Sequence, residues 1–259
     1  MNLKKILAFL MMGLLISSCD DQGNDKIIVG TSLDYAPYEY LDESNQISGI
    51  DMEIIKHIAK KLDKEIEIKN IDFQGLIPSI KSGHIDLAIS AFTKTEERAR
   101  EVDFSIPYYS VKFAILYNAK NVSESKVKEF FVNSKIDPSK LFGNFGVQSG
   151  TNMESFIKSL NQDRDNFDVK SYANNLSMIS LLNTNVIDFV IMDSLPAKAF
   201  ASRNKNLQYI ELYETKFDLG IVFPKNSKLI DKVNEVIDDM IDDREIEKIE
   251  RKILREFDE

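Results

Sequence analysis

The stretch GIDMEIIKHIAKKL, residues 49–62, has the pattern of a helix with one buried face. Its apolar side chains recur at intervals of three and four residues, which places them along one side of a helix. These positions are Ile50, Ile54, Ile55, Ile58, Ala59 and Leu62. Asp51 stands at the start and Lys60 and Lys61 at the end, the arrangement that the helix dipole favours. Such a helix needs an apolar surface to cover.

Short apolar strands are predicted before and after this helix in the sequence, and they supply that surface. Before it, KIIVGTS (26–32) is a β-branched run that ends in a polar turn, and after it EIEIKNI (65–71) alternates as a strand does. GLIPSIKSG (75–83) then predicts a short helix closed by Gly83, and IDLAIS (85–90) predicts another buried strand. Helices between short apolar strands imply right-handed βαβ crossovers and a largely parallel sheet covered on both faces.

The same alternation returns later in the chain, after a more polar stretch at 117–140. In order, it gives the strand and turn FGVQSGT (145–151), the helix MESFIKSL (153–160), the strand FDVKSY (167–172), the helix NLSMISLLNTN (175–185) and the strand VIDFVIMD (186–193). Two α/β lobes are therefore predicted in series. In open α/β sheets, ligands bind at the carboxyl ends of strands. The residues at such ends are Ser32, Ser90, Gln148 and Asp193.

Composition and motifs narrow the function classes. The chain has 259 residues, of which 43% are hydrophobic and 29% charged, with a formal net charge of −9. Acidic and basic residues are interspersed, which argues against a nucleic-acid binder, since such a protein needs a basic face. The histidines, His57 and His84, lie in no cluster with metal-ligand spacing, and the sequence contains no phosphate-binding loop or nucleophile elbow. We therefore expect no metal and no cofactor.

The first nineteen residues, MNLKKILAFLMMGLLISSC, have the layout of an export signal, with two lysines, an apolar run and small residues before the only cysteine. The ending LISSC resembles the bacterial lipobox, which implies a signal peptide at 1–18, lipidation of Cys19 and a lipidated tether at 19–26. A plain secretory peptide with an incidental cysteine is the alternative. We expect a protein of the cell envelope, outside the cytoplasm and held at a membrane by its anchor.

Four segments, taken in order, carry a family resemblance. They are VGTSLDYAPYEYLDESNQISGIDMEIIKHIAKKL (29–62), FQGLIPSIKSGHIDLAISAFTKTEERAREVDFSIPYY (73–109), FGVQSGTNMESF (145–156) and LLNTNVIDFVIMD (181–193). They resemble the signatures of the extracellular solute-binding proteins, family 3, of amino-acid ABC importers. The resemblance runs from about residue 27 to residue 225. It implies a periplasmic-binding-protein-like (type II) fold, in which two hinge strands join two α/β lobes and the ligand lies in the cleft.

The same resemblance implies how the chain is divided. Residues 27–110 and 218–259 would form lobe I, and residues 111–217, with the hinge segments, would form lobe II. The C-terminal stretch, from residue 226 to residue 254, has apolar residues at helical spacing and many charge pairs. We expect it to pack back on lobe I as one or two helices.

A free amino acid is a zwitterion, so its receptor needs a fixed cation for the carboxylate and acceptors for the ammonium. Arginine suits the first task, because its planar fork donates two parallel hydrogen bonds and keeps its proton. By resemblance, Arg98, five residues after Thr93, grips the carboxylate, and Thr93 adds a hydroxyl or an N–H. The loop Ser90–Ala91 would accept from the ammonium through the Ser90 carbonyl. Without the family, Arg98 reads as a partner of neighbouring glutamates on a solvated helix face.

The second lobe would supply the opposite wall of the cleft. The resemblance implies that Asp193 binds the ammonium there. Thr151 and Asn152, after Gln148, would present backbone N–H groups at a helix N-terminus, where the dipole and the unpaired donors favour a carboxylate. Taken alone, this segment is an ordinary turn.

The predicted pocket departs from the family pattern at one position. Ser32 stands where relatives that bind basic or amide side chains often have aspartate, which puts a strictly cationic ligand in doubt, and Asp34 follows two residues later. Tyr35 and Phe73 match positions where rings stack on the aliphatic part of the ligand, with core packing as their alternative. Met192 is expected to line the same pocket.

The mechanism implied is capture by closure about hinges near residues 110–113 and 213–218. A monomeric receptor would deliver an amino acid to an ABC permease and its ATPase subunits, with no catalysis of its own. Two alternatives stay open. One is an exported cyclohexadienyl dehydratase acting on prephenate-like acids, with Glu39 or Asp34 as general acid/base. The other is a ligand-sensing binding protein.

Overall fold

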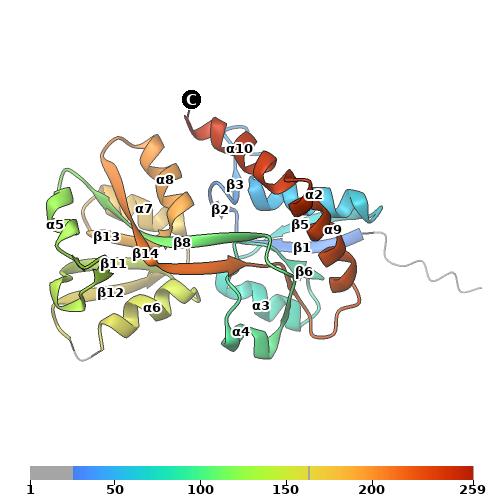
Figure 1. The fold of residues 1–259 in the computed structure, drawn as a ribbon, viewed down its shortest axis with the longest axis horizontal. Helices are drawn as coiled ribbons and strands as arrows, with labels where there is room; N and C mark the ends of the chain where they lie inside the picture. The colour runs from blue at the N-terminus through green and yellow to red at the C-terminus, as the bar shows by residue number, and fades with distance from the viewer. Residues whose placement is uncertain (1–25, 163, 259) are drawn as a thin grey trace, which may run out of the picture.

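The computed structural model describes residues 26–162 and 164–258. Two five-stranded sheets with helices on their faces lie next to each other, and two long strands run from one to the other (Figure 1). The predicted signal peptide, Cys19 and most of the tether lie outside the described residues. In the part of the chain that is described, no helix is long and apolar enough to cross a bilayer.

The first sheet has the strand order β5-β1-β6-β15-β7. Its strands are β1 (Lys26–Thr31), β5 (Glu65–Asn70), β6 (Leu87–Ala88), β7 (Asp103–Phe104) and β15 (Val222–Phe223). β1 pairs in parallel with β5 and β6, whereas β15 is antiparallel to β6 and β7. The strand predicted at 85–90 is shorter because the chain leaves the sheet at Ser90, although Ile89 N still donates to Gly30 O (3.1 Å).

Five helices cover this sheet, and we call the sheet with them the first lobe. They are α2 (Ile50–Lys61), α3 (Phe73–Lys81), α4 (Glu96–Glu101), α9 (Ile230–Asp242) and α10 (Glu245–Asp258). The predicted apolar face of α2 is buried, with Ile54, Ile55 and Ile58 fully inaccessible. A small antiparallel sheet packs against the start of α2. Its strands are β2 (Asp34–Tyr35), β3 (Glu39–Leu41) and β4 (Ile47–Ser48).

The second sheet has the order β12-β11-β13-β8-β14 and, with its helices, forms the second lobe. Its strands are β8 (Tyr109–Asn118), β11 (Gly143–Gln148), β12 (Phe167–Tyr172), β13 (Phe189–Asp193) and β14 (Leu207–Leu219), and its main helices are α6 (Asn152–Leu160), α7 (Asn175–Asn183) and α8 (Ser194–Arg203). Between β8 and β11 lie α5 (Glu124–Lys128), the hairpin β9 (Phe131–Val132) and β10 (Lys135–Ile136), and a 3-10 turn at Pro138–Lys140. Buried phenylalanines fill the core of this lobe, with Phe145 stacked on Phe189 at 4.7 Å between ring centroids.

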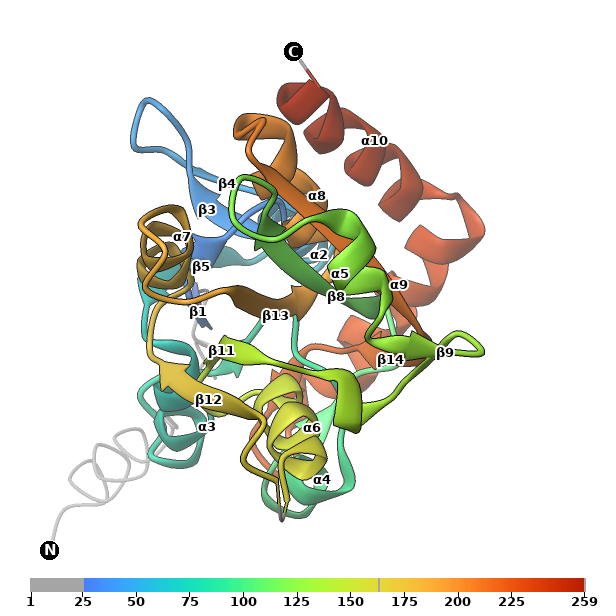
Figure 2. The same ribbon diagram turned by 90° about the vertical axis from the view of Figure 1, so that its left-hand side faces the viewer.

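Strands β8 and β14 connect the two lobes (Figure 1), and Figure 2 shows these paired strands side by side from the end of the second lobe. They pair antiparallel from Asn118 opposite Leu207 to Tyr109 opposite Leu219, and their register shifts between Leu212 and Phe217. A ladder interrupted in this way bends more easily than a regular one. The shift lies within the segment that the sequence predicts as a hinge, and we keep that assignment as a proposal.

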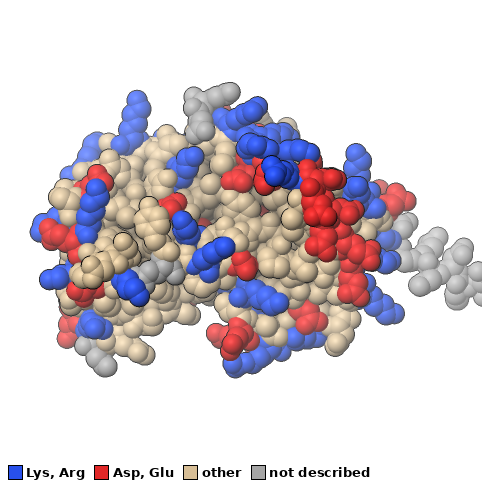
Figure 3. All heavy atoms as spheres, viewed as in Figure 1, with Lys and Arg blue, Asp and Glu red and all other residues tan. Residues whose placement is uncertain are grey.

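The C-terminal helices pack on the first lobe, and α10 also reaches the second. It contacts α2 and α9, and at its end the ring of Phe257 lies 4.2 Å from the guanidinium carbon of Arg203 in α8. Acidic side chains gather over α9 on the face seen in Figure 3, and lysines and arginines are scattered over the rest of that face. We read these charges as the solvated face that the sequence predicts.

Candidate functional site

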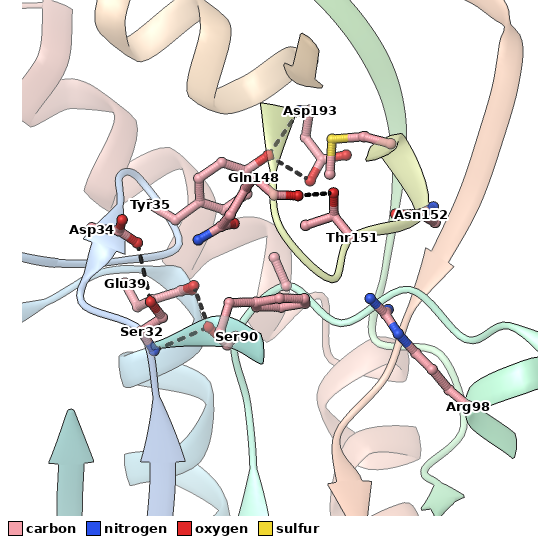
Figure 4. A pocket seen from close by; sticks show the side chains of 13 residues that line it. Ser32, Asp34, Tyr35, Glu39, Ser90, Arg98, Gln148, Thr151, Asn152 and Asp193 are labelled. Carbon is pink, nitrogen blue, oxygen red and sulfur yellow. Dashed lines mark hydrogen bonds between the residues drawn. The ribbon is translucent and has the colours of Figure 1, made fainter. Parts of the chain in front are cut away.

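A narrow cavity lies between the two lobes, where strands of both sheets end. The first lobe contributes Ser32, Asp34, Tyr35, Glu39, Phe73, Ser90, Ala91 and Arg98, and the second contributes Gln148, Thr151, Asn152, Met153 and Asp193. Figure 4 shows these side chains converging from both sides. Of the eleven ligand-binding residues predicted from the sequence, all but Thr93 line this cavity.

Arg98 lies at one end of the cavity, on the short helix α4. The Thr95 hydroxyl caps this helix and accepts from Arg98 N at 3.2 Å. The guanidinium donates to Thr93 O at 2.7 Å and to Gly150 O of the second lobe at 2.9 Å. Thr93 itself is buried below the cavity, so it holds Arg98 through its carbonyl.

Two aromatic rings hold the Arg98 guanidinium in place. Its central carbon lies 5.3 Å from the ring centroid of Phe73 and 5.1 Å from that of Phe92, within the range of cation–π attraction. Burial lowers the pKa of the Arg98 guanidinium to about 10, so the group remains charged at neutral pH. Glu101, one of the glutamates considered as its partner, pairs with Lys81 instead at 2.5 Å. The position is therefore unlike a solvated helix face.

Asp193 faces the cavity from the second lobe, at the junction of β13 and α8. The residue is fully buried. Its Oδ2 accepts from the Tyr35 hydroxyl at 3.0 Å, the same hydroxyl accepts from Asp193 N at 2.8 Å, and Oδ1 has no hydrogen-bond partner. Burial raises the pKa of the Asp193 carboxyl to about 7, although the Tyr35 hydroxyl and the Arg98 charge oppose the rise. A buried acceptor without a donor is costly, so Oδ1 is suited to a ligand donor.

A chain of hydrogen bonds lines the first-lobe wall. Ser90 Oγ donates to Glu39 Oε1 at 2.7 Å and accepts from Ser32 N at 3.1 Å. Ser32 Oγ donates to Asp34 Oδ1 at 3.2 Å. Glu39 is almost completely buried, and its Oε2 has no hydrogen-bond partner. The serine at position 32 thus organises two carboxyl groups beside it.

The second-lobe wall is built around the first turn of α6. The Thr151 hydroxyl donates to Gln148 O at 2.7 Å and accepts from Glu154 N at 3.2 Å, which caps the helix. The first N–H groups of a helix have no partner within it, and the first turn of α6 borders the cavity next to Arg98, which donates to Gly150 O. The Asn152 side-chain amide is buried without a partner. This end of the cavity is rich in donors and suits an anion.

Two residues predicted to contact the ligand, Thr93 and Met192, do not line the cavity. Met192 does not line the cavity, because strand alternation turns its side chain into the core of the second lobe; Met153, at the start of α6, lines it instead. Glu39, which the sequence suggested only as a possible catalytic acid, is one of the lining residues. The stacking positions Tyr35 and Phe73 both border the cavity.

Three hydrogen-bonded contacts join the lobes around the cavity, so the structure represents a closed form. Two are the Arg98 to Gly150 and Tyr35 to Asp193 contacts described above. The third is the carboxylate of Asp34, which accepts from Asn175 N at 2.6 Å and from Asn175 Nδ2 at 3.3 Å. Asn175 begins α7, so a first-lobe carboxylate caps a second-lobe helix, where the dipole favours negative charge.

Replacing Asp34 with asparagine is expected to weaken ligand binding about threefold to tenfold by destabilising the closed form. Asparagine removes the charge at the α7 terminus and replaces one carboxylate oxygen with an NH2 donor that faces the donors of Asn175, which costs about 0.5–1.5 kcal/mol in a net hydrogen bond. Titration calorimetry measures the affinity, and spin labels on the two lobes measure the closed fraction. Asp168→Asn, which removes an exposed charge from β12, serves as the control. An unchanged closed fraction in Asp34→Asn would exclude this contact as a latch.

Comparisons with known proteins agree with this geometry. The family model described as "Bacterial extracellular solute-binding proteins, family 3" matches residues 27–256. The arginine-binding extracellular protein ArtP of Bacillus subtilis is 31% identical over 239 residues, covering 91% of this chain and 89% of that protein. A crystal structure of an amino-acid ABC transporter substrate-binding protein from Streptococcus pneumoniae, bound to L-arginine, has a TM-score of 0.81 and 29% identity and covers 92% of this chain and 98% of the other. An ancestral amino-acid-binding protein, called a precursor of cyclohexadienyl dehydratase, has a TM-score of 0.77 and 27% identity, covering 90% of this chain and 96% of the other.

Proposed function

Because the chain belongs to family 3 of the bacterial extracellular solute-binding proteins, we propose that it is an extracytoplasmic receptor that captures an amino acid by lobe closure and delivers it to an ABC importer. The family match confirms the resemblance read from the sequence, and the structural likeness confirms the type II periplasmic-binding-protein fold. Delivery to a permease rests on the family and on relatives that belong to ABC transporters.

One observation carries the proposal: Arg98 and Asp193 face a single closed cavity from opposite lobes. The Arg98 end, with the α6 terminus, suits a carboxylate. The unpartnered Asp193 Oδ1 suits an ammonium group. A zwitterion that spans both ends contacts both lobes, so it stabilises the closed form over the open one. Only such differential affinity shifts the equilibrium toward closure.

The charges of the cavity favour a ligand with a cationic side chain. Of the thirteen described lining residues, three are carboxylic acids and one is an arginine. Asp193 is assigned to the ammonium and Asp34 already accepts from Asn175. The Glu39 carboxyl is left to bind the ligand side chain. It would do the work of the aspartate that such relatives often have at the position of Ser32. Both ArtP and the ligand of the pneumococcal structure point to arginine, and we propose a basic amino acid of that kind.

Catalysis is the weaker reading. Glu39 and Asp34 lie in the cavity, as a dehydratase would require, but each is engaged by neighbouring donors in a binding wall. The structural neighbour related to that enzyme is itself an amino-acid-binding protein. Family membership places the protein outside the cytoplasm. The ending LISSC supports our proposal of a lipid anchor at Cys19, and a monomer held by that anchor is the form we expect.

The proposal is tested by thermal unfolding of the chain from residue 20 on, which contains the whole family match, against the twenty amino acids, citrulline and prephenate. A ligand at 100 times its Kd adds about 2.7 kcal/mol of stability. We expect arginine to raise the melting temperature and prephenate to be neither bound nor consumed. If prephenate is turned over, or if no amino acid raises the melting temperature, the receptor proposal is wrong.

Glu39→Gln is expected to remove most of the preference for arginine over citrulline, a neutral ligand of nearly the same shape. In the wild-type protein we expect arginine to bind at least tenfold more tightly, because a charged group left facing a neutral one costs about 1.5–3 kcal/mol. Competition calorimetry measures the ratio of the two affinities. Glu43→Gln removes an exposed charge from the same hairpin and should leave the ratio unchanged. If the ratio of the arginine and citrulline affinities is unaltered in Glu39→Gln, the side chain of the ligand lies in another part of the cavity.

A further inference from the structure

A second buried carboxyl group, Asp51, lies directly behind Glu39 and does not line the cavity. Its Oδ2 accepts from Ala91 N at 2.8 Å, and its two oxygens receive the Tyr108 hydroxyl at 2.9 and 3.0 Å. Asp51 is fully buried, and the two carboxyl groups accept hydrogen bonds from neighbouring residues of one loop, Glu39 from Ser90 Oγ and Asp51 from Ala91 N, which brings them close together. The binding role proposed above uses Glu39 but assigns nothing to Asp51.

The backbone brings these two carboxyl groups together. Ile50 N donates to Pro37 O and Asp51 N donates to Tyr38 O, both at 2.9 Å, so the β2–β3 hairpin is fixed to the first turn of α2. Gly49 makes this approach possible: its φ is +129°, and a Cβ there would lie 2.1 Å from Tyr38 O. Glu39 and Asp51 are therefore held as a pair by the fold, whatever the state of the cavity.

The pair has too few donors for two negative charges. Glu39 receives one hydrogen bond, from Ser90, and its Oε2 receives none. The charged groups near the pair are the carboxyls of Asp34 and Asp193 and the guanidinium of Arg98, and of these Asp193 faces it from the second lobe. The remaining titratable neighbours are the hydroxyls of Tyr35, Tyr38 and Tyr108. Two like charges this close and this buried do not both ionise, so the pair shares a proton unless a cation reaches it.

Building on the proposed function, we propose that a proton and the cationic side chain of the ligand compete for the Glu39–Asp51 pair, so that binding of a basic amino acid releases a proton. Asp51 acts as a positioning residue, because its charge adds to the effect of burial on Glu39 and keeps the proton on the pair to higher pH. A neutral side chain leaves the proton in place. The proton thereby tunes selectivity for charge at the far end of the cavity.

The direction of the pKa shifts fits this exchange. Burial raises the pKa of Asp51 to about 7, and burial together with the Asp51 charge raises the pKa of Glu39 well above its usual value. Near neutral pH, the empty pair therefore holds a proton, and a bound cation lowers the pKa of the pair. The affinity for arginine relative to citrulline should rise severalfold as the pH rises from about 6 to 8. The titration belongs to the pair rather than to one residue.

The test is calorimetry of arginine and of citrulline in two buffers with different protonation enthalpies, at pH 6.5. The buffer dependence of the heat counts the protons released. Asp193 also holds a proton near neutral pH, but both ligands carry an ammonium group, so its release is common to both. We expect arginine to release up to one proton more than citrulline. In Asp51→Asn this difference should become clearly smaller and the pH dependence of the affinity ratio should move to lower pH, because burial is then the main remaining cause that raises the pKa of Glu39. Glu53→Gln, on the same helix but outside the cavity, should behave as wild type.

The outcomes separate this inference from the function on which it rests. If arginine and citrulline release the same number of protons from the wild-type protein, the exchange is overturned while the receptor function stands, and this measurement needs no variant. If Asp51→Asn folds and keeps the difference, the pair is not its source, and the exchange is again overturned. A protein that binds neither amino acid overturns the proposed function and the exchange together.

Discussion

Replacing Arg98 with alanine is expected to weaken the binding of every α-amino acid about a hundredfold or more. The ligand carboxylate would enter a closed cavity in which Glu39 and Asp193 remain but the charged donor is missing. Truncating one partner of a buried, hydrogen-bonded charge pair costs about 2–5 kcal/mol, and about 2.8 kcal/mol is a hundredfold in Kd. The loss should be the same for arginine and citrulline, because both carry the same carboxylate.

Titration calorimetry of wild type, Arg98→Ala and Arg100→Ala measures this effect. Arg100 is exposed and lies two residues further along α4. Arg100→Ala therefore removes the same charge at a position away from the cavity. Lysine at position 98 provides a graded case: it keeps the charge but cannot donate a planar fork, so we expect an intermediate loss. Arg98→Ala also removes the contact with Gly150 O that joins the lobes. If Arg98→Ala binds within threefold of wild type, the carboxylate does not lie at this end.

The fold was predictable because helix and strand periodicities are local properties of the sequence. The apolar face of 49–62 gave the correct helix, and the repeat of the strand–helix alternation gave the correct second lobe. The ends of elements were less predictable. The predicted strand at 85–90 is longer than β6 because apolar residues continue to Ile89. The pairing in the sheet ends earlier, where the loop that lines the cavity begins. Tertiary contacts, rather than propensity, set that boundary.

The ends of predicted strands identified Ser32, Ser90, Gln148 and Asp193 from the sequence pattern alone. The family resemblance was needed to place Arg98 opposite Asp193, although 95 positions separate them in the sequence. The Glu39–Asp51 pair shows the limit of the approach. The sequence explains Asp51, in the first turn of the helix, as an acidic residue that the helix dipole favours. The structure shows it buried, together with its neighbours Ile50 and Met52. An aspartate between two apolar residues, two positions after the N-cap Gly49, was the available signal. The contact with Glu39 depends on a backbone approach that no periodicity encodes.

Replacing Asp193 with asparagine is expected to weaken binding of both arginine and citrulline about a hundredfold. The amide oxygen can still accept one hydrogen bond, but the charge opposite the ammonium is lost in a site closed to water, where a charged partner is worth more than a neutral one. Tyr35 provides the matched comparison. Tyr35→Phe keeps the Asp193 charge and removes only the hydroxyl that bonds to Oδ2 and accepts from Asp193 N, so its loss should be about fivefold.

The pH dependence of citrulline binding separates a charge effect from a general weakening of closure. Burial raises the pKa of the Asp193 carboxyl to about 7, so in the empty protein the group takes up a proton as the pH falls through that value. An ammonium group requires the ionised form, and the wild-type affinity for citrulline should therefore decrease tenfold for each pH unit below about 6. Asparagine has no proton to exchange, so Asp193→Asn should bind weakly with an affinity that does not change with pH, while Tyr35→Phe should keep the wild-type slope. If the slope survives in Asp193→Asn, the ammonium contacts another carboxylate, and Glu39 and Asp34 become the next candidates.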